Sequence, residues 1–184
     1  TTPPTNYPTN YPTTEPTFAS KADWIKAQEQ LTKGKATGKV CKGGYVNSLD
    51  QYVDCETLIG FLTIANSQET DLSKLSKLKN FFAFDNQRKG IEVKYNTKMT
   101  HLELSAQANI GTLIITDNAN LNKISVKADT DDVKVSNNKA LTKMQLNGQV
   151  KGGYTVSNNQ ALKTISGDSK VPGATKAGAS LVIP

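Results

Sequence analysis

Two stretches of sequence decide the fold: VKVSNNKALTKMQL at residues 133–146 and YTVSNNQALKTIS at residues 154–166. Two earlier stretches have the same skeleton, LIITDNANLNKISV at 113–126 and, more weakly, IEVKYNTKMTHLEL at 91–104. The shared frame is a strand, an asparagine, a leucine-like residue and a second strand. The four asparagines are Asn96, Asn118, Asn138 and Asn159. Their spacings of 22, 20 and 21 residues give a period near 21, which indicates a solenoid.

Within each copy, apolar residues alternate with polar ones. Pairs such as Leu113 and Ile115 bracket one residue, which places both members on one face of a strand. The other pairs are Leu62/Ile64, Phe82/Phe84, Ile91/Val93, Val133/Val135, Tyr154/Val156 and Leu181/Ile183. A further apolar residue follows nine positions after most pairs, and it marks a second strand. The pattern predicts a mainly β fold, a right-handed single-stranded parallel β-helix similar to leucine-rich-repeat solenoids, with coils stacked about 4.8 Å apart.

The repeated asparagines have a structural explanation. Asparagine tolerates left-handed backbone angles at a tight corner and hydrogen-bonds to neighbouring peptide groups. We therefore expect Asn96, Asn118, Asn138 and Asn159 to form a structural ladder.

The chain divides into three predicted segments. Residues 1–18 are rich in Thr and Pro and predict a disordered stalk or linker. Residues 19–57 predict a helical, disulfide-bonded N-terminal cap: Ser20 can cap a helix that ends before Gly34, with Trp24 and Leu31 as its apolar anchors. Residues 58–184 hold the repeats. Because the sequence stops inside a strand-like segment, we expect the repeat region to be truncated at its C-terminus.

Composition excludes several classes of protein. The net charge of +6 is carried almost wholly by lysine, and Arg88 is the only arginine, which argues against nucleic-acid recognition. No apolar run reaches the length of a membrane span. The glycine-bearing loop expected at 38–44 lacks the spacing of a phosphate-binding loop. The lysines favour weak attraction to acidic surfaces such as anionic glycans or membranes.

The two cysteines, Cys41 and Cys55, are too few for a metal site. A disulfide in a secreted protein is the preferred interpretation, and two free buried thiols are the alternative. We expect an extracellular protein, secreted or associated with the cell surface or cell wall.

With the repeat and the cysteines in view, the segment SLDQYVDCETLIGFLTI at 48–64 resembles the receptor L domain family. That family includes the ligand-binding lobes of insulin- and EGF-type receptors and fungal GPI-anchored cell-wall proteins. The resemblance covers about residues 41–184. It implies a surface-displayed β-helix closed by an N-terminal helix and disulfide, in which Cys41 and Cys55 match the first cysteine pair.

Parallel β-helices also include polysaccharide-active enzymes, which need paired carboxylates or a metal with a base. The acidic candidates are Asp129, Asp131, Asp132, Glu92 and Glu103. The aspartates share one turn, where acidic residues are common, and the two glutamates fall on different strands. We expect His101 to be exposed rather than catalytic. The sequence therefore predicts no enzyme, no cofactor and no metal site.

The predicted function is noncatalytic recognition or adhesion through a flat β-helix face that binds a protein or glycan. The outward residues of this candidate face are Thr63, Glu92, Ile114, Lys134, Thr155 and Val182. The second face carries Glu103, Ser125, Gln145 and Ser166, which we expect to face solvent. A structural component of a cell wall or matrix is the alternative function, and a polysaccharide-active enzyme is the least favoured.

Overall fold

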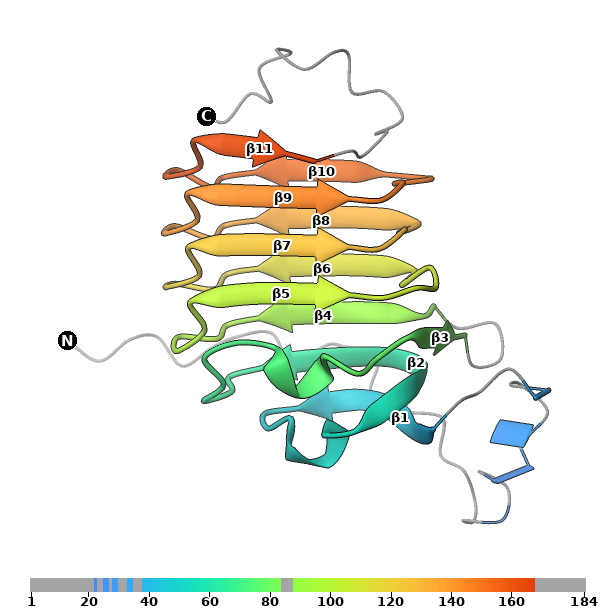
Figure 1. The fold of residues 1–184 in the computed structure, drawn as a ribbon. Coiled ribbons are helices and arrows are strands. Elements are labelled where there is room, and N and C mark those ends of the chain that lie inside the picture. Colours follow the sequence, from blue (N-terminus) through green and yellow to red (C-terminus); the bar gives the residue numbers. More distant parts are fainter. Residues whose placement is uncertain are drawn as a thin grey trace.

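The computed structural model describes residues 38–83 and 88–167, together with residues 22, 25, 26, 28, 29, 33 and 34. The first two ranges form a β-solenoid of about six coils (Figure 1). This confirms the predicted mainly β, parallel solenoid. In Figure 1 the front strands run to the right and the rear strands to the left as the chain climbs, which is the right-handed sense that parallel connections favour.

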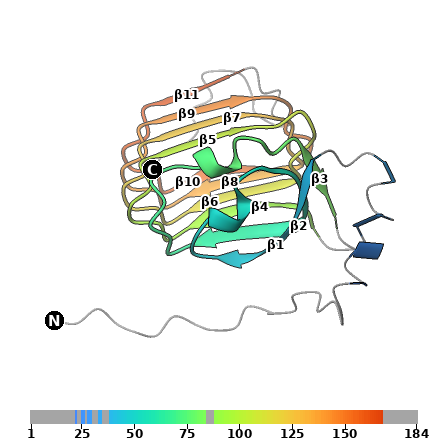
Figure 2. The same ribbon diagram turned by 60° about the horizontal axis from the view of Figure 1, so that its bottom comes forward.

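Two parallel sheets lie on opposite sides of the solenoid (Figure 2). Sheet A contains, in spatial order, β1 (Lys39–Val46), β2 (Cys55–Ala65), β4 (Gly90–Lys94), β6 (Thr112–Thr116), β8 (Asp132–Ser136) and β10 (Tyr154–Ser157). A short strand, β3 (Asn80–Phe82), also pairs with β2. Sheet B contains β5 (His101–Ser105), β7 (Lys123–Lys127), β9 (Lys143–Asn147) and β11 (Thr164–Ser166).

The core is a stack of aliphatic side chains between the two sheets. The alternating residues predicted to face inward on β4, β6 and β8 are almost fully buried, as are their sheet B counterparts Leu102, Ile124 and Met144. The leucine-like residue after each ladder asparagine fills the corner between the sheets. These corner residues are Met99, Leu121, Leu141 and Leu162. Each coil thus buries residues at the same positions, which explains the period of the sequence.

The helical N-terminal cap is not supported. Residues 22, 25, 26, 28 and 29 are helical, but all except half-buried Gln28 are exposed, and Trp24 and Leu31 lie outside the described residues. Two short 3-10 helices cross the N-terminal end of the core instead, η1 (Asp50–Tyr52) and η2 (Ser73–Leu75) (Figure 2). Their segments close the end with the buried side chains of Leu49, Tyr52, Leu72, Leu75 and Leu78.

The solenoid also begins earlier than the predicted boundary at residue 58. The segment expected to be a glycine-bearing loop forms β1, which pairs in parallel with β2. Gly43 permits this pairing, because a Cβ there would lie 2.4 Å from the carbonyl oxygen of Phe61. A disulfide between Cys41 and Cys55 joins the two strands, with the Cα atoms 6.0 Å apart.

One inward pair is displaced from its predicted position. Phe81, not Phe82, is buried against the core, because β3 pairs with the first half of β2 and places Phe81 beside inward-facing Leu58. The predicted strand residues Phe84, Leu181 and Ile183 lie outside the described residues, as does the stalk at 1–18.

Candidate functional site

The predicted binding residues form one continuous row across sheet A. Thr63 pairs with Glu92, Glu92 with Ile114, Ile114 with Lys134, and Lys134 with Thr155. The last predicted member, Val182, lies outside the described residues. The strand register therefore brings together five of the six residues on one outward face.

Sequence reasoning missed a sixth member of this row, Tyr45 on β1, which pairs with Thr63. Tyr45 is 60% exposed, and its hydroxyl oxygen lies 3.3 Å from the amide nitrogen of Asn66. The sequence signal for a strand was the adjacent pair Tyr45 and Val46, which match outward Thr63 and inward Ile64. The neighbouring glycines made the segment resemble a loop. We call Tyr45, Thr63, Glu92, Ile114, Lys134 and Thr155 the sheet A row.

The two halves of the sheet A row differ in polarity and exposure. The Glu92 carboxylate accepts hydrogen bonds from Lys94 Nζ at 2.9 Å and from Thr63 Oγ1 at 3.1 Å, and the Lys94 side chain is only 6% exposed. These groups hold one another in place. Ile114 is half-buried, and Lys134 and Thr155 are exposed. The parts of the row available to a partner are thus Tyr45 at one end and the second half, from Ile114 to Thr155.

The four repeated asparagines form a ladder at the corner between the sheets, and all four are fully buried. The side-chain oxygens of Asn118, Asn138 and Asn159 each accept from the asparagine one coil earlier. Asn118 Oδ1, for example, lies 3.1 Å from both the backbone nitrogen and Nδ2 of Asn96. Asn138 and Asn159 repeat the arrangement. The ladder extends one coil toward the N-terminus, where the backbone nitrogen of Ser67 donates to Asn96 Oδ1.

The left-handed backbone angle expected at these asparagines belongs instead to the residue before each one. At this corner of the successive coils, the residues with positive φ are Asn66, Tyr95, Asp117, Asn137 and Asn158. The sequence signal for this was the presence of two adjacent asparagines at 137–138 and at 158–159, of which the first takes the positive φ. One residue adopts the left-handed backbone angle, and the next makes the hydrogen bonds of the ladder. A single asparagine was expected to do both.

The acidic residues considered for catalysis act at the opposite corner. Asp129 Oδ1 accepts from the backbone nitrogen of Gln149, and Asp132 Oδ1 accepts from that of Gly153. Asp131 Oδ1 accepts from the side-chain amide of Asn109. All three aspartates therefore join one coil to its neighbour, as turn chemistry predicts.

The remaining catalytic candidates are dispersed. Glu92 lies on sheet A and Glu103 on sheet B. His101 is exposed on sheet B, and its Nδ1 lies 2.8 Å from Thr100 Oγ1. Among the described residues, no group of three or more His, Cys, Asp or Glu side chains is arranged to hold a metal ion.

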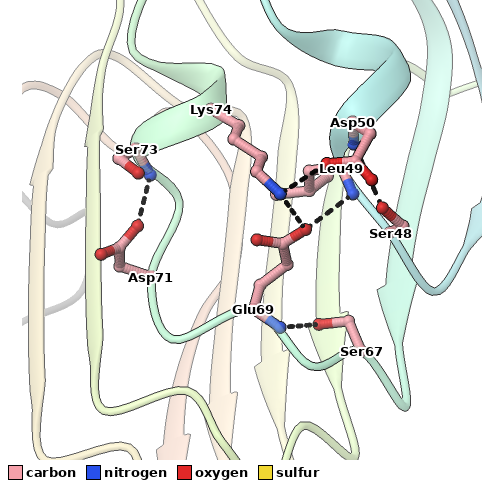
Figure 3. A network of polar contacts seen from close by, with 8 residues as sticks. All are labelled: Ser48, Leu49, Asp50, Ser67, Glu69, Asp71, Ser73 and Lys74. Atoms are coloured by element: carbon pink, nitrogen blue, oxygen red, sulfur yellow. Dashed lines mark hydrogen bonds and ion pairs between the residues drawn. The ribbon is translucent and has the colours of Figure 1, made fainter.

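A polar network ties the two 3-10 helices together (Figure 3). Glu69 Oε1 accepts from the backbone nitrogen of Leu49 at 3.0 Å and from Lys74 Nζ at 2.8 Å. Lys74 also bonds to Asp50 at 2.7 Å, and this bond lowers the pKa of Asp50 and raises that of Lys74. Glu69 is largely buried and bonds the backbone nitrogen of Leu49, the residue just before η1. The network therefore has a structural role: it holds the two short helices together.

Burial shifts the pKa of two further side chains. Desolvation lowers the pKa of Lys89, whose Nζ donates to the carbonyl oxygen of Asn109 at 3.0 Å. Desolvation also raises the pKa of Tyr154 to about 12. Tyr154 packs against the edge of the core, and Lys89 bonds backbone carbonyl oxygens.

Sheet B presents a basic surface that sequence reasoning assigned to solvent. Lys123 pairs with His101 on one side and with Lys143 on the other, and all three side chains are exposed. Lys127 on the same strand and Lys163 just before β11 are exposed as well. The sequence signal for this surface was that, in two of the four repeats, a lysine directly precedes the first apolar residue of the second strand: Lys123 before Ile124 and Lys143 before Met144.

Comparisons with known proteins leave this surface without an assigned role: no family model, no curated protein and no solved structure matches the chain. Among the described residues, no helix has both the length and the apolar character needed to cross a membrane.

Proposed function

We propose that this protein is a noncatalytic recognition domain that acts outside the cell and binds a partner protein through the sheet A row. The observation that carries the proposal is the unbroken register of this row from Tyr45 to Thr155. Rigid parallel strands hold an exposed aromatic, an aliphatic and a lysine side chain on one flat face. Aromatic residues are enriched at protein interfaces.

Two further observations support an extracellular setting. The disulfide between Cys41 and Cys55 is typical of proteins in oxidising compartments. The resemblance of residues 41–184 to receptor L domains implies a surface-displayed module with this kind of cysteine pair. Ile114 supplies a half-buried aliphatic side chain beside exposed Lys134 in the same row.

The test is a pull-down of solubilised surface proteins with the purified chain and matched variants. Ile114→Glu and Lys134→Glu should each reduce capture of one protein by about tenfold or more, since a misplaced charge at a docked face costs more than a kcal/mol. Lys143→Glu makes the same charge change on sheet B and should leave that capture unchanged.

Equal capture by all variants would overturn the proposal. Retention of the chain on insoluble wall material, unchanged by every one of these substitutions, would favour the structural alternative. A melting temperature equal to that of the wild type would show that the fold is intact in each variant.

A further inference from the structure

The lysines of sheet B form no ion pair within the described part of the chain. All five ion pairs found among the described residues involve residues 50–94, which belong to the first three coils. Lys123, Lys127, Lys143 and Lys163 lie in the later coils, and none of them has an acidic partner within 4.0 Å in the described part of the chain. We call these four residues the lysine strip.

The register places like charges directly beside one another. Lys123 and Lys143 are paired neighbours on adjacent strands, where successive coils are about 4.8 Å apart. Like charges directly opposite in a sheet destabilise it. A bound anion between the two ammonium groups removes this repulsion, so the arrangement is better suited to an occupied surface than to an empty one.

The surface between the lysines is polar. Lys123 and Lys127 are four residues apart on β7, which separates them by about 13 Å. Between them runs a row of hydroxyl and amide side chains. Contrary to the expectation that this row faces solvent, Ser125 is buried; Gln145 is half-buried and Ser166 is exposed, so Gln145 and Ser166 are the accessible members. Such groups hydrogen-bond sugar hydroxyls, while lysines on either side attract acidic substituents.

We propose that the lysine strip binds an acidic polysaccharide, laid along the solenoid axis with its carboxylate or sulfate groups against the lysines. Lys123 and Lys143 occupy the same position on successive coils, which suits a polymer with charges at regular intervals. This surface lies on the sheet opposite the sheet A row, so the proposal is independent of the protein-binding function.

The structure also marks where this site ends. In the row of Ser125, the position on β5 is occupied by Glu103, which is exposed. A carboxylate there repels an acidic polymer and sets the N-terminal limit of the strip. Replacing it with lysine extends the positive surface by one coil.

The experiment measures binding of the full chain to polygalacturonate, dextran sulfate and neutral dextran by calorimetry or biolayer interferometry. Wild type should bind one or both acidic polymers, more weakly at high salt, and should not bind neutral dextran. The double variant Lys123→Gln/Lys143→Gln should weaken binding by about tenfold, and Glu103→Lys should strengthen it by about threefold.

The matched control is Lys134→Gln/Lys151→Gln, which removes the same charge from exposed positions outside sheet B and should change affinity less than twofold. If the two double variants weakened binding equally, net charge alone would explain the effect and the proposal would be overturned. The absence of binding to both acidic polymers would also overturn it. Binding to anionic phospholipid vesicles but to neither soluble polymer would also overturn it. Ile114→Glu should leave polysaccharide binding unchanged, so the two proposals fail separately.

Discussion

At the scale of single residues, the ladder explains why each coil carries asparagine at one position. The site needs an acceptor for the preceding coil and donors for the following one. Asn118 meets both needs: its Oδ1 accepts from Asn96, and its Nδ2 lies within 3.0 Å of Asn138 Oδ1 and of the Val93 carbonyl oxygen. Aspartate has the same shape but no donor, and a buried stack of carboxylates would repel itself.

Asn138→Ala tests the ladder directly. The substitution leaves the backbone nitrogen and amide group of Asn118 without their partner at the Asn138 position, and each unsatisfied buried group costs about 1–3 kcal/mol. We expect a loss of about 3 kcal/mol and a fall in melting temperature of roughly 10 °C, measured by thermal and urea denaturation.

A matched control is available one coil away. Asn120→Ala removes the same atoms from an exposed side chain that makes one bond, from its Nδ2 to the Thr97 carbonyl oxygen, and should cost less than about 1 kcal/mol. If the two variants were equally stable, the buried ladder would not be a source of stability.

At the scale of elements, the two corners of each coil are built differently. One corner uses a left-handed residue followed by a ladder asparagine. The other uses aspartates such as Asp129 and Asp132, which accept from backbone nitrogens of the next coil. The first two coils lack sheet B strands, and η1 and η2 take their place. Glu69 and Lys74 join these two short helices, and Glu69 is the more buried of the two side chains.

Glu69→Ala should therefore loosen the N-terminal end of the solenoid. Its carboxylate is 14% exposed and satisfies the buried backbone nitrogen of Leu49, so its loss should cost about 1–3 kcal/mol in urea denaturation. Asp50→Asn is the control, because the Asp50 side chain is 80% exposed and exposed pairs contribute little. A larger effect of Asp50→Asn would contradict this account of the joint.

At the scale of the whole molecule, each coil contacts only its neighbours. The stability of such a solenoid is approximately a sum of coil and interface contributions. A change at one end should therefore affect nearby coils more than distant ones. The disulfide provides a way to perturb one end, because it ties the edge strand β1 to β2 and lies far along the axis from β8.

We expect Cys41→Ser/Cys55→Ser to cost about 3 kcal/mol, the value for a closed loop of about 15 residues. Hydrogen exchange should show the loss of protection chiefly in β1 and η1, while β6 and β8 keep theirs. Reduction of the wild type should reproduce this pattern and leave the double variant unchanged. A uniform loss of protection across all coils would contradict the neighbour-only description.

The sequence by itself determined the repeat, the class of fold and the inward residues of the later coils. Alternation and a period near 21 arise from burial of the same positions in every coil, and such periodicity is visible in one dimension. It also supplied the ladder asparagines and the sheet A row from Thr63 to Thr155.

Only the tertiary structure decided how the coils are aligned and how the N-terminal end is closed. β1 carries two glycines and gains its strand conformation from pairing with β2, a contact that local sequence does not encode. The residue with positive φ is set by the geometry of the corner, not by the asparagine itself. The lysine strip appears only when register brings Lys123 beside Lys143, since the two residues lie 20 positions apart in the chain and become neighbours through the stacking of coils.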